Sequence, residues 1–244
     1  HALSVMVIRK FKLKSRNATK AWCYGLTNCI SGKQHNLTAP LPRNLQKMIT
    51  ENLIEKDKVY ECDCMELMRV MAAQDLKVDC VITDPPYGIN FSSHFRKEKF
   101  EVILNDNLGD EEFKKFLQDY FDGCYKILKD DSFLISFMGW STIPKFNRAI
   151  KAAGFEIKSM PIWVKNNFGL GYYTRPQYEP MYLCLKGKPK PPETAISDVI
   201  NCNRVPNLIH SCQKPVDLIC KLLSTFTKKG DIVCDIDSPR CAAP

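Results

Sequence analysis

The chain has 244 residues, a formal net charge of +8, 45% hydrophobic residues and 25% charged residues. These values are ordinary for a globular α/β domain with a sizeable core, and no apolar run is long enough to cross a membrane. The composition therefore predicts a soluble globular protein and excludes a protein with membrane-spanning helices.

The basic charge is concentrated at the N-terminus. Residues 1–50 contain nine of the 35 Lys and Arg residues and none of the 27 Asp and Glu residues. We expect residues 1–56 to form a basic N-terminal extension and residues 57–244 to form the folded domain. Such an extension can bind phosphate backbones without reading sequence. The alternative is an extension that is disordered or non-native.

The twelve cysteines include no C-x-x-C pair. Cys80, Cys184 and Cys234 lie in apolar runs, where cysteine acts as a small hydrophobic residue. This usage predicts free thiols in a reducing compartment and no metal site.

Strands and helices alternate after residue 57. A first strand is also expected near residues 5–13. The predicted strands then cover residues 59–62, 78–83, 133–138, 155–164, 180–185 and 232–234, and the predicted helices cover residues 65–73, 110–128, 144–153 and 214–226. This alternation predicts an α/β fold with a mostly parallel sheet covered on both faces. Ligands of such sheets bind at the carboxyl ends of the strands, where Asp63 and Asp84 both fall.

The segment Asp84-Pro85-Pro86-Tyr87-Gly88 follows the predicted strand 78–83. Two prolines and a glycine explain a stiff turn with a sharp exit, but they do not explain an acid and an aromatic ring at the mouth of the sheet. A rigid backbone can aim a carboxylate and a carbonyl at the two hydrogens of a base amine, and a tyrosine ring can stack on that base.

Asp-Pro-Pro-Tyr resembles the catalytic motif of the S-adenosylmethionine-dependent amino-methyltransferases, which methylate adenine N6 or cytosine N4 in DNA. The flanking segments 59–88, 163–188 and 210–235 are also similar to blocks of this family. Here the catalytic motif precedes the cofactor strand, an order that resembles the β group and its bacterial and phage adenine-specific members. The resemblance implies a Rossmann-like methyltransferase fold and a flipped adenine in duplex DNA as the target. N4-cytosine remains the alternative.

The resemblance also implies roles for individual residues. Asp84 would accept a hydrogen bond from the target amine, Pro85 would offer its carbonyl, and Tyr87 would stack on the base. The implied catalytic residues are Asp84, Pro85, Pro86 and Tyr87. The residues implied to bind S-adenosylmethionine are Asp63, Cys64, His210, Gln213, Lys214, Pro215 and Asp235. The residues expected to bind DNA are His94, Arg96, Lys97, Tyr172, Tyr173 and Arg175, and residues 166–209 would form the recognition region.

The resemblance ends after Asp235, where the family continues with a glycine-rich loop and this chain runs Ile236-Asp237-Ser238-Pro239. We therefore expect an incomplete cofactor site and a sheet that lacks the strand between those ending at Asp63 and Asp235. The N-terminal segment or a partner would have to fill that gap. A truncated, non-catalytic DNA-binding remnant is thus a second alternative. The expected partners are duplex DNA and a cognate restriction endonuclease, with no membrane, in the cytoplasm of a bacterial or phage-infected cell.

Overall fold

The computed structural model describes the chain at residues 4–10, 54, 58–89, 105–206 and 213–237. In this part of the chain no helix is long and apolar enough to cross a membrane. The strands are β1 (Ser4–Lys10), β2 (Lys58–Cys62), β3 (Val78–Asp84), β4 (Leu128–Phe137), β5 (Glu156–Ser159), β6 (Ile162–Val164), β7 (Tyr178–Lys186), β8 (Val199–Asn201) and β9 (Ile232–Asp237). The helices are α3 (Cys64–Ala73), α4 (Asp110–Ile127), α5 (Ile143–Ala152), α6 (Val216–Phe226) and the short 3-10 helix η1 (Trp140–Thr142).

The strands form one sheet in the order β2-β1-β9-β3-β4-β7-β6-β8, with β5 also paired to β7. Two strands, β1 and β7, run opposite to all the others, as the pairing of neighbouring strands shows. The predicted α/β fold with a sheet of mostly parallel strands is therefore confirmed. The carboxyl ends of β2, β9 and β3 consequently meet at one edge of the sheet.

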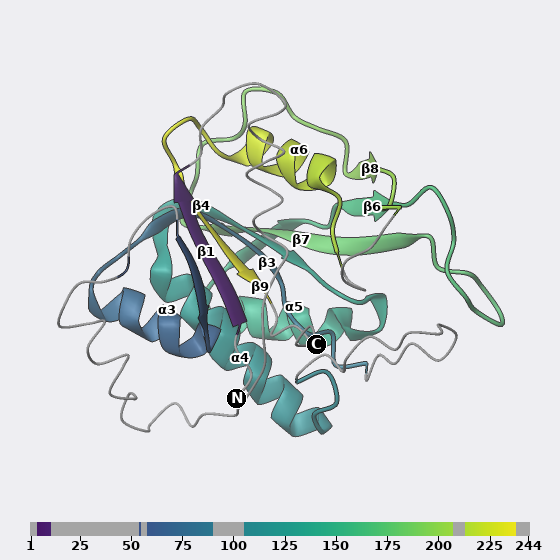
Figure 1. Cartoon of the computed structure of the whole chain (residues 1–244), viewed down its shortest axis with the longest axis horizontal. Coiled ribbons are helices and arrows are strands. Elements are labelled where there is room, and N and C mark those ends of the chain that lie inside the picture. The colour runs from purple at the N-terminus through teal and green to yellow at the C-terminus, as the bar shows by residue number, and fades with distance from the viewer. Residues whose placement is uncertain (1–3, 11–53, 55–57, 90–104, 207–212, 238–244) are drawn as a thin grey trace.

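Helices cover the two faces of the sheet, as predicted. Helices α3, α4 and α5 lie on one face and α6 lies on the other (Figure 1). The alternation of side chains along a strand separates the two cores. In β3, Val81 joins the core under α3 and α4, whereas Cys80 and Ile82 join the core under α6.

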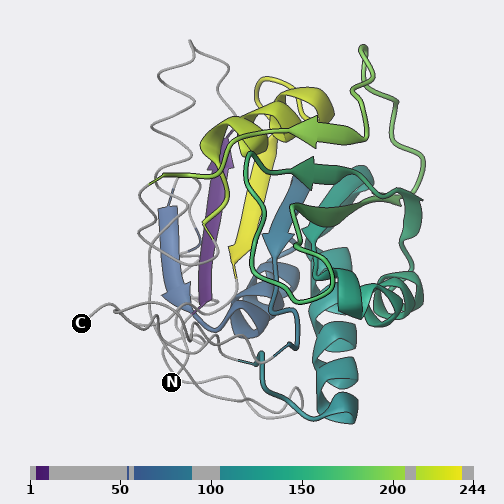
Figure 2. The ribbon, with the colours of Figure 1, turned by 90° about the vertical axis from the view of Figure 1, so that its right-hand side faces the viewer.

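Strand β1 fills the predicted gap in the sheet. It pairs antiparallel with β2, where Ser4 lies opposite Cys62, and antiparallel with β9, where Val7 lies opposite Asp235. Figure 2 shows β1 between these two strands. Of the two ways to close the gap, the N-terminal segment is the one that the structure shows. Part of the predicted basic extension is therefore paired with strands of the predicted folded domain, while residues 11–53 lie outside the described part.

The single strand predicted over residues 155–164 was wrong, because it is divided into β5 and β6. Pro161 lies between them and has no N–H to donate to a strand ladder. Its carbonyl oxygen still accepts a hydrogen bond from the Met181 N–H at 2.9 Å, so both pieces follow β7.

The cysteines of the described strands are core residues, as the sequence predicted. Cys80, Cys184 and Cys234 are buried, and burial raises the pKa of each thiol and keeps it protonated. Seven cysteines in the described part of the chain are free thiols: Cys64, Cys80, Cys124, Cys184, Cys202, Cys220 and Cys234.

The position of β1 yields a test of the sheet. Val7 lies opposite Val59 on one side and Asp235 on the other, so the substitution Val7→Pro removes a ladder hydrogen bond from an internal strand. We expect a loss of about 3 kcal/mol in the free energy of unfolding, measured by urea denaturation. Ser4→Pro, at the first residue of the strand, is the control and should cost far less. Equal losses for the two variants would contradict the pairing of β1 with both neighbours.

Candidate active site

The Asp-Pro-Pro-Tyr turn leaves the sheet at the carboxyl end of β3 and is fixed from two sides. Pro85 and Pro86 are buried. Gly88 has a positive φ of +66°, and a Cβ at this position would lie 2.6 Å from the ring of the buried Phe113. The buried Asp106 accepts hydrogen bonds from the N–H of Gly88 at 2.7 Å and of Ile89 at 3.2 Å. The glycine and the aspartate therefore set the exit of the chain and hold the turn in place.

Both carboxylate oxygens of Asp84 have partners in the site. Oδ1 accepts a hydrogen bond from the Tyr87 hydroxyl at 2.7 Å, and Oδ2 accepts one from Lys214 Nζ at 2.5 Å. The side chains of Asp84 and Lys214 are only 14% and 10% exposed. The tyrosine ring packs on the backbone of Gly139, where a Cβ would lie 3.3 Å from the tyrosine side chain. The structure thus brings together three residues that the sequence predicted for the site.

A second carboxylate lies beside Lys214 on β7. Glu179 Oε2 is 3.3 Å from Lys214 Nζ, and Glu179 Oε1 is 2.5 Å from Lys165 Nζ. Charges of alternating sign therefore run from Lys165 through Glu179 and Lys214 to Asp84. Burial by itself would raise the pKa of Glu179, but the two neighbouring ammonium groups outweigh it and lower this pKa below its ordinary value.

Sequence reasoning did not identify Glu179 or Lys165. Both lie in the segment 163–188 that resembles a block of the family. The available signal was that Glu179 is the one acid in the strand Tyr178–Lys186, most of which is apolar. That signal could not show which cations would lie beside it, because they come from β6 and from the start of α6.

The carboxyl end of β9 is held to its neighbours by hydrogen bonds to one carbonyl group, that of Ile236. Thr83 of β3 and Tyr120 of α4 both donate hydrogen bonds to the Ile236 carbonyl oxygen, at 2.5 Å and 3.1 Å. Both side chains are buried. These bonds hold the end of β9 level with the start of the Asp-Pro-Pro-Tyr turn, and Asp84 lies opposite Asp237 in the strand register.

The residues predicted to bind a cofactor are spread along this edge. Asp63 caps α3, because its carboxylate accepts hydrogen bonds from the N–H of Met65 at 2.8 Å and of Glu66 at 3.3 Å. Two strands separate β2 from β3, so Asp63 is about 14 Å from Asp84 on a strand spacing of about 4.8 Å. Asp235 is partly exposed in β9 between them.

The remaining residues predicted to bind the cofactor lie at the start of α3 and just before α6, apart from His210. Cys64 is buried in the first turn of α3, and Gln213 is buried next to Lys214. Pro215 is the N-cap of α6 rather than a residue of its first turn. His210 lies outside the described residues.

Aromatic side chains are exposed on the loop between β6 and β7, which projects away from the sheet (Figure 1). Tyr172 and Tyr173 are fully exposed, and Phe168 is half exposed. The Arg175 guanidinium lies 3.9 Å from the centre of the Phe168 ring, and its Nε donates a hydrogen bond to the Gly169 carbonyl at 2.9 Å. The loop therefore presents a cation and several rings to solvent. The other residues predicted to bind DNA, His94, Arg96 and Lys97, lie outside the described residues.

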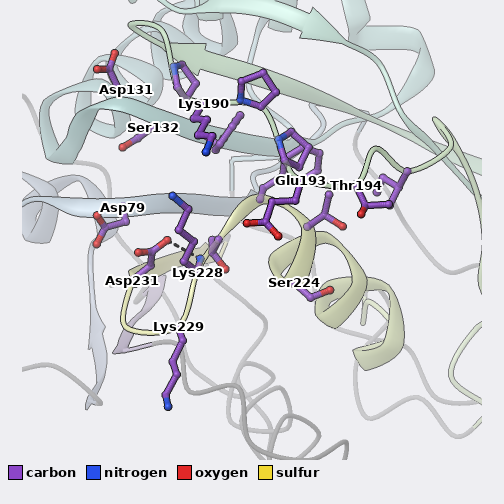
Figure 3. A pocket seen from close by; sticks show the side chains of 18 of the residues that line it. Asp79, Asp131, Ser132, Lys190, Glu193, Thr194, Ser224, Lys228, Lys229 and Asp231 are labelled. Carbon is purple, nitrogen blue, oxygen red and sulfur yellow. Dashed lines mark hydrogen bonds between the residues drawn. The ribbon is translucent and has the colours of Figure 1, made fainter.

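A groove of about 860 Å³ lies at the opposite, amino-terminal end of the strands (Figure 3). Its three aspartates, Asp79, Asp131 and Asp231, accept hydrogen bonds from backbone N–H groups. Asp79 accepts from Ile232 and Asp231 accepts from Lys228. None of the residues predicted individually for the catalytic, cofactor or DNA site lines this groove, although its lining residues between 188 and 196 belong to the predicted recognition region 166–209.

These observations define the class of protein. The fold is an α/β sheet with an Asp-Pro-Pro-Tyr turn at its carboxyl edge, and a profile of the DNA methylase family matches residues 78–236. The chain belongs to this family of N6-adenine and N4-cytosine DNA amino-methyltransferases.

The chain is also similar to individual known proteins. The chain is 30% identical over 173 residues to YubD of Escherichia coli (strain K12), which is named as a methylase, and the match covers 71% of each chain. The solved structure of the cytosine-N4-specific PvuII DNA methyltransferase is 14% identical, covers 71% of each chain and superimposes with a TM-score of 0.54, which shows the fold. The M1.HpyAVI–SAM complex is 20% identical, covers 71% of this chain and 77% of its own, and gives a TM-score of 0.49.

The glycine after the tyrosine gives a second prediction. Gly88→Ala places a Cβ against Phe113 at a positive φ, so we expect a loss of about 1–3 kcal/mol in the free energy of unfolding together with displacement of the turn. Gly109→Ala is the control, because Gly109 has an ordinary φ of −58° and a Cβ there would be 3.7 Å from its nearest neighbour. Urea denaturation compares the two. Equal stability of both variants would refute the proposed constraint.

The lowered pKa of Glu179 gives a third prediction, on acid stability. A carboxylate with a lowered pKa in the folded state stabilises the protein above its unfolded pKa of about 4.3, and this contribution is lost as the pH falls through the folded value. In the Glu179→Gln variant, the free energy of unfolding should therefore fall less steeply below about pH 4.5 than in the wild type. The control is Glu156→Gln on β5, whose side chain is 62% exposed. If the free energy of unfolding falls by the same amount in the wild type and in Glu179→Gln as the pH is lowered, the prediction is wrong.

Proposed function

We propose that the chain transfers a methyl group from S-adenosylmethionine to the N6 amine of an adenine flipped out of duplex DNA. The observation that carries this proposal is the Asp84 carboxylate, which a rigid Asp-Pro-Pro-Tyr turn holds at the carboxyl edge of the sheet beside Tyr87 and Lys214. Membership of the DNA methylase family supports the reaction class.

The chemistry follows from the groups at this edge. The cofactor, when bound, supplies an electrophilic methyl group. Asp84 accepts a hydrogen bond from the target amine, and the Pro85 carbonyl accepts the second, which favours a pyramidal and more nucleophilic nitrogen. As the new N–C bond forms, the bond between the methyl carbon and the cofactor sulfur would break and leave a neutral thioether. The nitrogen then carries the positive charge, which the carboxylate of Asp84 stabilises until the nitrogen loses a proton.

The donor set along the edge suits S-adenosylmethionine. The acids Asp63 and Asp235 would accept from hydroxyl and ammonium groups, and Lys214 would face a carboxylate. Asp63 directly follows β2, Asp235 lies within β9, and Lys214 lies in the segment just before α6. We include Cys64, Gln213, Pro215 and His210 in this proposed site as the surroundings of those polar groups.

DNA would be bound by the exposed loop between β6 and β7. Tyr172 and Tyr173 are free to stack on bases, and Arg175 supplies a positive charge. Together with His94, Arg96 and Lys97, these residues would hold the strand from which the base is extruded. A cognate restriction endonuclease is a further proposed partner.

Two alternatives are favoured by specific observations. The structural likeness to a cytosine-N4-specific enzyme fits N4-cytosine as the target, although aspartate as the first residue of the motif favours adenine. The sequence Ile236-Asp237-Ser238-Pro239, in place of a glycine-rich loop, fits a DNA-binding protein without methyl transfer.

Product analysis tests the proposal and separates the alternatives. Purified protein is incubated with unmethylated genomic DNA and S-adenosylmethionine carrying a labelled methyl group, and the digested nucleosides are identified by mass spectrometry. We expect labelled N6-methyladenine, and its loss in Asp84→Asn, since a neutral amide cannot stabilise the positive nitrogen. Asp75→Asn, at an aspartate whose side chain is 87% exposed and lies outside the proposed site, should retain activity. Detection of labelled N4-methylcytosine would instead identify cytosine as the target base. The absence of any labelled base would overturn the proposal.

A further inference from the structure

Lys214 lies between two carboxylates that compete for its ammonium group. Nζ is 2.5 Å from Asp84 Oδ2 and 3.3 Å from Glu179 Oε2. The aromatic ring of Phe137 packs below it, with the ring centre 5.0 Å from Nζ. In this arrangement the ammonium occupies the carboxylate that the target amine has to reach, while the Tyr87 hydroxyl occupies the other oxygen.

Glu179 holds its second oxygen ready for an ammonium group. Lys165 fixes Oε1 at 2.5 Å, and the Lys165 ammonium is itself placed 5.0 Å from the centre of the buried Trp163 ring. Oε2 is buried, and among the described residues no donor makes a well-aligned hydrogen bond to it. A buried acceptor without an aligned donor is costly and is uncommon in folded proteins.

We propose that Glu179 is a positioning residue that draws Lys214 away from Asp84 when the target amine enters the site. This role rests on the function proposed above. In the empty site, Lys214 neutralises Asp84. In the substrate complex, Lys214 pairs with Glu179, and Asp84 Oδ2 becomes an acceptor for the amine.

The move is small and keeps the ammonium group of Lys214 paired with a carboxylate throughout. Shortening the Lys214–Glu179 distance from 3.3 Å to about 2.8 Å makes a full charge-assisted hydrogen bond. Lys214 is 10% exposed, so an ammonium group left without a carboxylate would pay a large desolvation cost. Glu179 removes that cost because it is a counter-ion in both positions. Lys165 in turn holds Glu179 in place, so the second position exists before the substrate arrives.

A crystal structure of the Asp84→Asn variant tests the exchange without requiring activity. The neutral amide is a weaker acceptor than a carboxylate, so we expect Lys214 Nζ to approach Glu179 Oε2 to about 2.8 Å, with Lys165 unchanged on Oε1. If Lys214 stays 3.3 Å from Glu179 and remains on the substituted side chain, the exchange is refuted. This result is independent of whether the protein methylates DNA.

Steady-state methyl transfer tests the role in the reaction. Glu179→Gln leaves Lys214 on Asp84, so kcat/KM for DNA should fall by about tenfold or more. The Lys214→Met background also loses the proposed contact to the cofactor carboxylate, so both backgrounds are measured at saturating S-adenosylmethionine. There the same substitution should have no further effect, because the competing ammonium is gone. Equal losses in both backgrounds would show that Glu179 acts only on the fold and would overturn the proposal. Glu156→Gln is the matched control. A wild type that transfers no methyl group would refute the proposed function, and the crystal structure would still decide the exchange.

Discussion

A buried ammonium group needs a counter-ion, and this requirement organises the site. Lys214 is shielded from water by Phe137 and Tyr87, so its charge is stable only beside Asp84 and Glu179. Asp84 comes from the end of β3, Glu179 from β7 and Lys214 from the start of α6. The sheet and the helix that covers it must therefore be correctly packed before these charges can meet. The same packing holds the Asp-Pro-Pro-Tyr turn at the edge where a methyl donor and a base can approach each other.

One internal strand of the sheet runs opposite to both of its neighbours. β1 runs antiparallel between β2 and β9, whereas both neighbours run in the same direction. Without β1, the backbone groups of β9 on that side would lack partners, and β9 carries the carbonyl that Thr83 and Tyr120 bind. A strand from the N-terminal segment thus supports this edge of the sheet, although it lies outside the residues 78–236 that match the family profile.

Local chemistry made part of this structure predictable. The stiff turn at Asp84 and the alternation of strands and helices depend on neighbouring residues, so the fold class and the position of the Asp-Pro-Pro-Tyr turn at the edge of the sheet could be predicted from the sequence. The gap beside β9 was also predictable, but not that β1 would fill it, because strand pairing over such a separation leaves no local pattern. Glu179 was missed for the same reason, since its partners Lys165 and Lys214 meet it only in the folded sheet.

The most direct measurement is a calorimetric titration of the wild-type protein with S-adenosylmethionine, because the carboxyl edge of β2, β9 and β3 is inferred to hold this cofactor beside Asp84. Binding of one molecule per chain with a micromolar dissociation constant is the predicted result, and it would mean that the edge works without a glycine-rich loop. An absence of binding at millimolar cofactor would contradict the inferred site and would favour a protein that contacts DNA without transferring methyl groups.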